Sequence, residues 1–558
     1  MADVLKPLLS WLAVVIGRPD LALRLEKDRA YARALANERS RILDAPTSRG
    51  AAYDAARRRL DGPQALPFGT LPDGEEVRVR RAVALMSGLV LGATGAGKSR
   101  LLLSLLLRPL RQVIDDLRLD PRARREVPVE AEVIDPKAET YTLACKYIAA
   151  LWLRANPAGR DLLARSIRVI DWQKAAVSPI APYDNHFADI SNAYLAHLRV
   201  DTSVRASAAS YTDSMKQLAY MMAWLAIELR FPASYRFAVR FMHDPAYRAD
   251  ILARVPEPEV RYYFSQFELT VPKQTRDALL RRMQWATSFP EVRASVCVPP
   301  AALDRLGLLR EAPITLVNTA CTTTLPQAIG TERTAWRSID VLCAAPRRDP
   351  RRPKVYIHEE AVKFFEDPNA DHVEALQTGL RTLRSVNMGI VLSAQDFTNA
   401  LPANVVRTIL LNTTWIAGFR ANEDARIFWP HVARDPADRR PEEQQRRTFE
   451  RTMHDLARQH YMLLVKGEPA LPLRAPDVPD PADIAGVSDE ALLDTFAREI
   501  GARSMLPTAT AMQLIEEWEA DVVEKAAVPP APARAKSKAP ITSLAELKKF
   551  FTPEEEDE

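Results

Sequence analysis

Short apolar runs alternate with helical stretches through the middle of the chain. From residue 68 onward the apolar runs have the length of strands, and amphipathic segments separate them. Runs such as GIVLSA at 389–394 and YMLLV at 461–465 are apolar at nearly every position, which is typical of strands buried on both faces. This alternation predicts an α/β fold with a mostly parallel sheet. The predicted strands are 83–91, 131–134, 167–170, 314–317, 355–357, 388–392, 415–417 and 461–465.

The segments around these strands follow other patterns. Residues 18–60 read as helices rich in Arg, Ala and Leu, and the turn residues of 61–67 end them. Residues 174–293 carry little strand signal but several helical patterns, including 214–229 and 277–285. This part of the chain is therefore predicted to be a helical subdomain inserted into the α/β region.

The C-terminal part of the chain begins at the Pro-rich stretch 469–481. Two helices are predicted beyond it, at 489–500 and 509–525, before a Pro/Ala/Lys linker at 529–540. The predicted regions are a helical arm (1–62), the first part of the α/β core (63–173), the helical insertion (174–300), the second part of the core (301–475), C-terminal helices (476–527), and a flexible linker with an acidic helical tail (528–558).

Length and charge limit the possible functions only loosely. At about 150 residues a domain, 558 residues correspond to roughly three to four domains, and 47% hydrophobic with 27% charged residues is an ordinary globular composition. The net charge of +4 is not that of a histone-like nucleic-acid binder. However, the +5 of residues 18–60 and the five acids of 554–558 cancel in this total. The net charge therefore argues neither for nor against nucleic-acid binding. Any basic binding surface must be local.

The spacing of cysteine and histidine predicts no transition-metal site. The four cysteines, Cys145, Cys297, Cys321 and Cys343, form no C-x-x-C pair, and the eight histidines form no H-x-x-x-H pair. We therefore expect neither zinc nor disulfides, which fits a reducing compartment.

The most membrane-like segment lies at 5–17. Its apolar run spans about ten residues, whereas a membrane-spanning helix needs about 20. Arg18, Pro19 and Asp20 follow it in place of a small-residue cleavage site. These features predict a cytoplasmic protein in which 5–17 packs on a neighbouring element, and peripheral membrane attachment is the alternative.

The strongest chemical signal is a complete G-x-x-x-x-G-K-S motif between an apolar strand and a helix. Its glycines let the backbone turn tightly around phosphate oxygens, and the positive end of the following helix favours an anion. The lysine is expected to reach the β- and γ-phosphates of ATP, and the serine to coordinate Mg²⁺. The motif residues are Gly92, Ala93, Thr94, Gly95, Ala96, Gly97, Lys98 and Ser99.

A second strand, KVYIH, ends in two acids, Glu359 and Glu360. Hydrolysis of a nucleotide needs a carboxylate for the metal and a base for water. Because Mg²⁺ prefers carboxylate or water oxygen to imidazole, we assign Glu359 to the metal and Glu360 to the base. The alternative register places His358 on the metal side and Glu359 as the base.

Two further residues flank the predicted strand at 388–392. Gln395 follows the strand, where an open α/β sheet exposes its ligand crevice, and could sense the γ-phosphate or orient water. Arg384 precedes the strand and could act as an arginine finger in a neighbouring subunit.

The order of five stretches resembles the HerA/FtsK superfamily of P-loop motors, which includes the coupling ATPases of conjugation and type IV secretion. The resemblance covers residues 67 to about 475, with the helical insertion between the second and third stretches. The first stretch is PFGTLPDGEEVRV with GLVLGATGAGKS, and the second is VIDPKAE, whose last five residues are 135–139. The other three are LDRLGLLREAPITLVNTA at 303–320, IHEEAVKFF, and 384–395.

The resemblance implies a RecA-like core that assembles as a ring, usually hexameric, with ATP between subunits and a substrate strand in the pore. Lys98, Ser99, Glu359, Glu360 and Gln395 would then lie on one subunit, and Arg384 would reach into the next. The sequence departs from the family in two ways. Glu359 stands where Asp is common, and no β-barrel typical of HerA is visible in 18–60, although coupling proteins normally begin with membrane spans.

Three functions remain open at this point. The first is an ATP-driven ring motor that translocates DNA, the second a secretion ATPase that moves or unfolds protein, and the third a ring scaffold that gates a partner nuclease or effector. Clusters at 57–59, 122–125 and 347–352 are candidate basic surfaces for DNA, with solvated surface as the alternative. The amphipathic, acidic tail at 542–558 predicts a docking peptide for a partner protein, for which a frayed solubilising end is the alternative. Contact with a secretion machinery or a membrane surface is a further expectation.

Overall fold

The computed structural model describes most of the chain between residues 47 and 525. The described residues are 47–62, 65–120, 127, 130–171, 176–177, 217–218, 221–222, 224–225, 235–277, 280, 290, 293–294, 297–298, 302, 306, 308, 312–320, 353–362, 387–395, 397, 400–420, 425–432 and 440–525. The chain divides into two compact units, Met1–Ile515 and Glu516–Glu558, and the elements discussed below belong to the first, apart from the last part of the C-terminal helix α25 (Thr508–Lys525).

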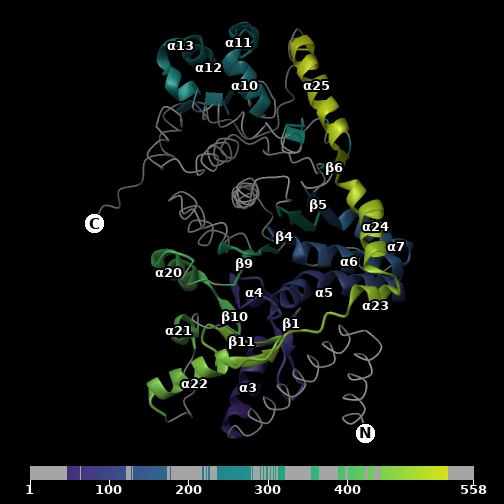
Figure 1. Cartoon of the computed structure of the whole chain (residues 1–558), viewed down its shortest axis with the longest axis vertical. Helices are drawn as coiled ribbons and strands as arrows, with labels where there is room; N and C mark the ends of the chain where they lie inside the picture. Colours follow the sequence, from purple (N-terminus) through teal and green to yellow (C-terminus); the bar gives the residue numbers. More distant parts are fainter. Residues whose placement is uncertain are drawn as a thin grey trace, which may run out of the picture. The chain divides into compact units, whose positions relative to one another are not determined.

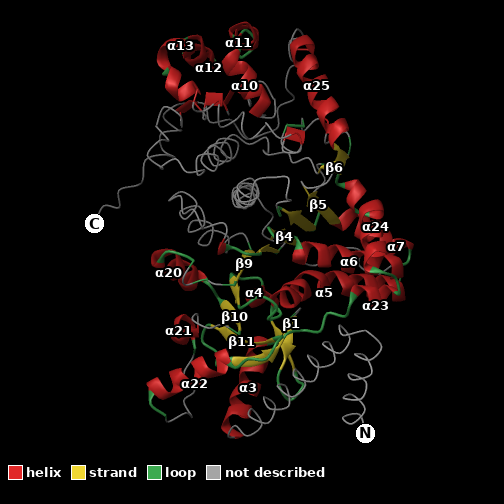
Figure 2. Cartoon of the chain, in the orientation of Figure 1, coloured by secondary structure: helices red, strands yellow, loops and turns green. Residues whose placement is uncertain are grey.

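An 11-stranded sheet forms the framework of the first unit (Figures 1 and 2). From one edge to the other its strands are β2 (Glu76–Val79), β1 (Leu66–Thr70), β12 (Leu471–Arg474), β11 (His460–Val465), β10 (Trp415–Phe419), β3 (Gly88–Leu91), β9 (Met388–Ala394), β8 (Lys354–His358), β4 (Glu130–Asp135), β7 (Ile314–Asn318) and β5 (Ile167–Asp171). Strands β10 to β5 in this order are parallel, whereas β11, β12, β1 and β2 pair antiparallel. The predicted α/β fold with a mostly parallel sheet is thus confirmed.

The described helices lie before, between and after these strands. They are α3 (Thr47–Leu60), α4 (Arg81–Ala84), α5 (Lys98–Leu119), α6 (Glu139–Arg154), α7 (Pro157–Ser166), α10 (Tyr235–His243), α11 (Pro245–Leu252), α12 (Pro258–Ser265), α13 (Phe267–Thr270), α20 (Ala403–Asn412), α21 (Ala425–Phe428), α22 (Glu442–His454), α23 (Pro481–Ala485), α24 (Asp489–Glu499) and α25 (Thr508–Lys525), with 3-10 turns η4 (Trp429–His431) and η5 (Gly501–Arg503). A separate antiparallel pair joins β6 (Ala176–Val177) to β13 (Leu506–Pro507).

The first half of helix α5 is buried on nearly every side, because its sequence there is almost entirely apolar. Leucines at 101, 102, 103, 105, 106 and 107 are all buried, which is expected for a helix enclosed by other elements rather than lying at a surface. Helices α6 and α7 join α5 and the strands in the same apolar core. Helices α23 and α24 pack on α6 in turn, so the segment after the Pro-rich stretch belongs to the core.

The antiparallel strands beside β10 differ from the prediction. Strands β1, β2 and β12 were not predicted, because LPFGT and LPLR contain Pro or Gly and are too short to show alternation. The predicted strand at 83–91 is shorter than expected, since α4 takes its first residues and β3 begins at Gly88. An aromatic cluster joins these strands to the parallel part: the Tyr461 hydroxyl donates to the Phe68 carbonyl at 2.6 Å, and Phe68 meets Trp415 edge-on.

Within the predicted insertion, α10 to α13 form a helical group around Phe264 and Phe267. Arg248 is 5% exposed, donates to the carbonyls of Phe241 and Met242 at 3.1 Å, and forms an ion pair with Glu268. The buried guanidinium is thus fully used in holding these short helices together.

Several predictions concern residues that the structure describes only in part. Within the basic cluster at 57–59, Arg57 pairs with Glu75, and the Nε and Nη2 of Arg59 both donate to the Glu468 carboxylate, so two of its three charges are used in ion pairs. Cys145 and Cys297 are buried, and neither forms a disulfide. The segment 5–17, the clusters at 122–125 and 347–352, Arg384, Cys321, Cys343 and the tail at 542–558 lie outside the described residues. Among the residues that are described, no helix is long and apolar enough to cross a membrane.

Substitution of Gly389 tests the tight packing of β9. A Cβ at this position would lie 1.7 Å from the Leu85 carbonyl oxygen, so Gly389→Ala must displace backbone. We expect the free energy of unfolding to fall by about 1–3 kcal/mol or more, because overpacked cores typically lose this much. Urea denaturation would measure the change. Gly62→Ala is the control, since its Cβ would lie 3.3 Å from the Arg80 side chain, and equal stability of both variants would contradict the tight packing.

Candidate nucleotide-binding site

The phosphate loop occupies the turn between β3 and α5, where the sequence places it. Gly97, directly before α5, has a left-handed φ of 118°, and a Cβ there would lie 3.0 Å from the Gln459 Cα. Conformation and space therefore both require glycine at this position. Nothing lies within 4 Å of the position that a Cβ of Gly95 would take, which leaves that side of the loop open. The loop and the helix N-terminus form the kind of cradle that binds phosphate.

Lys98 lies beneath this loop and is 8% exposed. Its Nζ donates to the carbonyl oxygens of Gly92 at 2.6 Å and Ala93 at 3.3 Å, which are neutral acceptors. Burial lowers the pKa of Lys98, while the carboxylates of Glu359 and Glu360 oppose this shift. The ammonium is thus a buried cation beside an open cradle, and an anion in the cradle would offset its desolvation.

Glu359 lies at the end of β8 and is 5% exposed. Its Oε1 accepts a hydrogen bond from the Thr140 hydroxyl at 2.7 Å. Burial raises the pKa of Glu359, and the neighbouring carboxylate of Asp135, itself 2% exposed, raises it further. Two buried acids this close repel one another when ionised, and a divalent cation at Glu359 would relieve that repulsion.

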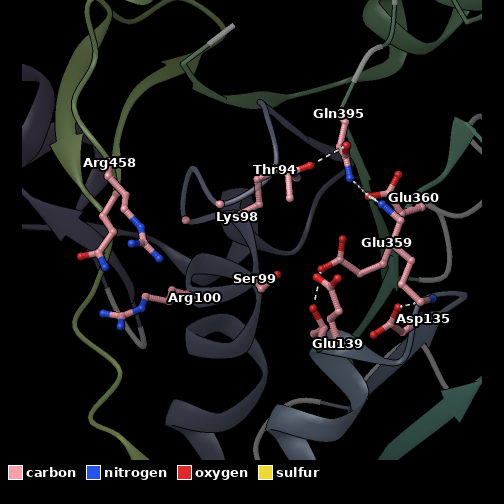
Figure 3. A pocket seen from close by; sticks show the side chains of 15 residues that line it. Thr94, Lys98, Ser99, Arg100, Asp135, Glu139, Glu359, Glu360, Gln395 and Arg458 are labelled. Carbon is pink, nitrogen blue, oxygen red and sulfur yellow. Dashed lines mark hydrogen bonds and ion pairs between the residues drawn. The ribbon is translucent and has the colours of Figure 1, made fainter. Parts of the chain in front are cut away.

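Glu360 belongs to a chain of polar contacts that begins at the phosphate loop. The Thr94 hydroxyl donates to the Gln395 Oε1 at 2.8 Å, and the Gln395 Nε2 donates to the Glu360 Oε1 at 2.6 Å (Figure 3). Lys137 forms an ion pair with the same oxygen at 2.8 Å. Glu360 also has a left-handed φ of 48°, which is unfavourable for a non-glycine residue and is typical of residues fixed at functional sites.

One pocket joins most of the residues that the sequence singled out. Thr94, Gly95, Gly97, Lys98, Ser99, Glu359, Glu360 and Gln395 all line it, while Gly92 and Ala96 complete the loop beside it. Seven further residues line the pocket but were not predicted as site residues. They come from β4, α6 and the turn between them, from α5, and from the turn before β11. VIDPKAE was noted only as part of the family resemblance, and ARQH at 457–460 matches no motif. These additional residues are Arg100, Asp135, Lys137, Glu139, Thr140, Arg458 and Gln459.

His358 does not line the pocket. It is 2% exposed, and its Nδ1 lies 3.0 Å from the Glu359 carbonyl oxygen. Burial lowers its pKa to about 4, so the imidazole is neutral at physiological pH. This geometry favours the register in which Glu359, not His358, is on the metal side.

The residues fit a magnesium nucleotide, in which phosphate oxygens complete the metal site. Within the described part of the chain, no three His, Cys, Asp or Glu side chains gather as a preformed metal site. Ser99 and Glu359 supply hard oxygen ligands, and Mg²⁺ commonly combines one or two carboxylates with phosphates and water. Phosphate oxygens and water would then complete the coordination of Mg²⁺ at this site.

Comparison with known proteins finds likeness in structure alone. No protein-family model matches the sequence, and no curated protein matches it. The structure of VirB4 of Thermoanaerobacter pseudethanolicus is similar at a TM-score of 0.48 and 14% identity, over 75% of this chain and 98% of that one. Two forms of the bacterial conjugative coupling protein TrwBdeltaN70, unbound and with sulphate, give TM-scores of 0.43 and 0.44 at 12% and 14% identity. They cover 76% of this chain and 92% and 93% of their own.

The buried His358 predicts a specific pH dependence of stability. Because its folded-state pKa of about 4 lies below the ordinary 6.5, the unfolded chain binds this proton more readily between those values. Folding stability should therefore fall as the pH drops through this window, by about 2–3 kcal/mol between pH 7 and pH 4.5.

Chemical denaturation of the wild type and His358→Gln across this range would measure the effect. The stability of the variant should fall less steeply than that of the wild type by this amount. His454→Gln, which removes an exposed imidazole from α22, is the control. Parallel curves for wild type and His358→Gln would show that His358 is not responsible.

Proposed function

We propose that the protein is an ATP-hydrolysing motor that assembles as a homo-oligomeric ring, of six subunits, and translocates DNA. One observation supports the proposed ATP hydrolysis. The phosphate loop, two acids at the end of β8 and an amide at the end of β9 line the same pocket. Each group is of the chemical type that hydrolysis of a magnesium nucleotide needs.

The residues divide the chemistry as follows. Lys98 and the loop amides bind the β- and γ-phosphates, and Ser99 and Glu359 hold Mg²⁺, which supplies charge neutralisation at the phosphates when bound. Glu360 accepts a proton from the attacking water, since it is the pocket carboxylate nearest to Gln395 and outside the buried acid pair. Gln395 links Glu360 to Thr94 of the phosphate loop, so it can report the state of that loop to the base.

The ring and the DNA substrate have a different basis. They rest on the order of motifs, which resembles that of the HerA/FtsK superfamily, and Arg384 would be the residue that completes the neighbouring subunit's site. A partner protein is proposed for the tail at 542–558. Transport of protein, or gating of a partner nuclease or effector, are the alternatives that the experiments below separate.

Two substitutions in the pocket separate nucleotide binding from hydrolysis. Lys98→Ala should lose nucleotide binding, because it removes the buried cation beneath the cradle. Glu360→Gln should bind ATP with near wild-type affinity but hydrolyse it about 100-fold more slowly or worse, the typical loss for a general base. Equilibrium binding of labelled ATP and steady-state phosphate release would measure the two effects.

The matched control is Glu490→Gln, which neutralises an acid in the first turn of α24. It should change neither binding nor turnover. Normal turnover in Glu360→Gln would contradict the assignment of the base. If Glu359→Gln kept metal-dependent ATP binding but lost hydrolysis in that case, the register with Glu359 as the base would hold.

Stimulation of ATP hydrolysis tests whether the translocated substrate is DNA. ATP hydrolysis by the full chain should increase on adding double- or single-stranded DNA, and the effect should weaken as salt rises, because backbone contacts release counterions. Hydrolysis stimulated by unfolded protein but not by DNA would select the secretion ATPase. Hydrolysis stimulated by neither would favour the ring scaffold and contradict translocation of DNA.

A further inference from the structure

Two arginines form a cationic side of the pocket to which no role has been given. Arg100 lies in the first turn of α5, and Arg458 lies in the turn between α22 and β11. Both line the pocket, and Figure 3 places them on the opposite side of Lys98 and Ser99 from Glu359, Glu360 and Gln395. In the part of the chain that the structure describes, neither guanidinium has a carboxylate partner.

Some other cations among the described residues do have a carboxylate partner. Arg57, Arg59 and Lys137, for example, each contact an acid. Two unpaired like charges on one side of a pocket repel each other, and an anion between them offsets that repulsion. Planar guanidinium groups are well suited to phosphate, since they donate two parallel hydrogen bonds to its oxygens.

The main chain fixes Arg458 to the phosphate loop. The Gln459 amide donates to the Ala96 carbonyl at 2.7 Å, and the amide of Ala475, the residue directly after β12, donates to the Gln459 carbonyl at 2.7 Å. Gln459 has a left-handed φ of 68°, an unfavourable conformation that these contacts hold in place. Arg458 is thus presented to the pocket by its own subunit, at a position set relative to the loop.

The direction of a bound triphosphate follows from the groups around the loop. The γ-phosphate must lie toward the metal-side acid and the base, which are Glu359 and Glu360 in the proposed function. The α-phosphate then lies at the other end of the cradle, beyond Ser99. That end is where Arg100 and Arg458 lie (Figure 3).

We propose that Arg100 and Arg458 together bind the α-phosphate of the nucleotide. This inference rests on the proposed nucleotide-binding function and adds a second cationic contact, supplied by the same subunit, to that of Lys98. The turn before β11 would then contact the nucleotide through Arg458.

The test compares ATP with inorganic tripolyphosphate, whose terminal phosphate can take the place of the α-phosphate. Arg458→Ala in the full chain should weaken binding of both ligands by a similar factor, about 10- to 100-fold, as expected for a lost charge-assisted hydrogen bond. Arg100→Ala should act in the same way. The double variant should lose less than the product of the two factors, because both side chains hold one group.

Arg451→Ala removes an exposed arginine of α22 that does not line the pocket, and should leave both affinities unchanged. Unfolding midpoints confirm that each variant is folded. A loss for ATP alone would assign Arg458 to the nucleoside and overturn the proposal, and so would unchanged binding of both ligands.

The Lys98→Ala variant separates this inference from the proposed function. If Lys98→Ala abolishes ATP binding while Arg458→Ala does not weaken it, only the α-phosphate assignment fails. If the wild-type chain binds neither ATP nor tripolyphosphate, the nucleotide-binding function itself fails.

Discussion

The hydrogen-bonded register of four parallel strands is the constraint on which the site depends. Strands β3, β9, β8 and β4 are neighbours in this order, and their pairing aligns Leu91 with Ala394, Leu392 with His358, and His358 with Ile134. Main-chain bonds continue the alignment past the strand ends, since the Glu359 amide donates to the Ile134 carbonyl at 3.0 Å. Because all four strands end together, groups far apart in sequence reach one pocket. A shift of one residue in any pair would turn side chains to the other face.

The same register holds conformations and charges that are unfavourable on their own. Within the described residues, four non-glycine residues have positive φ, and three of them, Ala138, Glu360 and Gln459, lie in turns that form the pocket. Each such conformation costs on the order of 1 kcal/mol or more, and the buried acids Asp135 and Glu359 add a cost of desolvation. The apolar core beneath, made by α5, α6 and α7 on the strands, supplies the stability that offsets these costs.

Acidic and basic side chains lie on opposite sides of the pocket. Acids and the Gln395 amide lie on one side of Lys98 and Ser99, and two arginines lie on the other (Figure 3). A compact anion, such as a single phosphate, would reach only one side of this arrangement. A ligand with a metal-bound end and a second anionic group several atoms away matches it well, so the pocket favours an extended polyphosphate in one direction.

The sequence by itself determined the parallel strands and the phosphate loop. Both follow from local causes: continuous apolar runs form strands buried on both faces, and G-x-x-x-x-G-K-S requires glycine conformations that few other sequences permit. It also indicated Glu359, Glu360 and Gln395, because each directly follows an apolar run. Strand β12 and the residues Lys137, Arg100 and Arg458 could not be assigned in this way. Their roles arise from pairing and proximity between separate segments of the chain, and Lys137 contacts Glu360 only because β4 and β8 are neighbours. Strand order, which depends on how the whole apolar core packs, decided which of these polar residues meet.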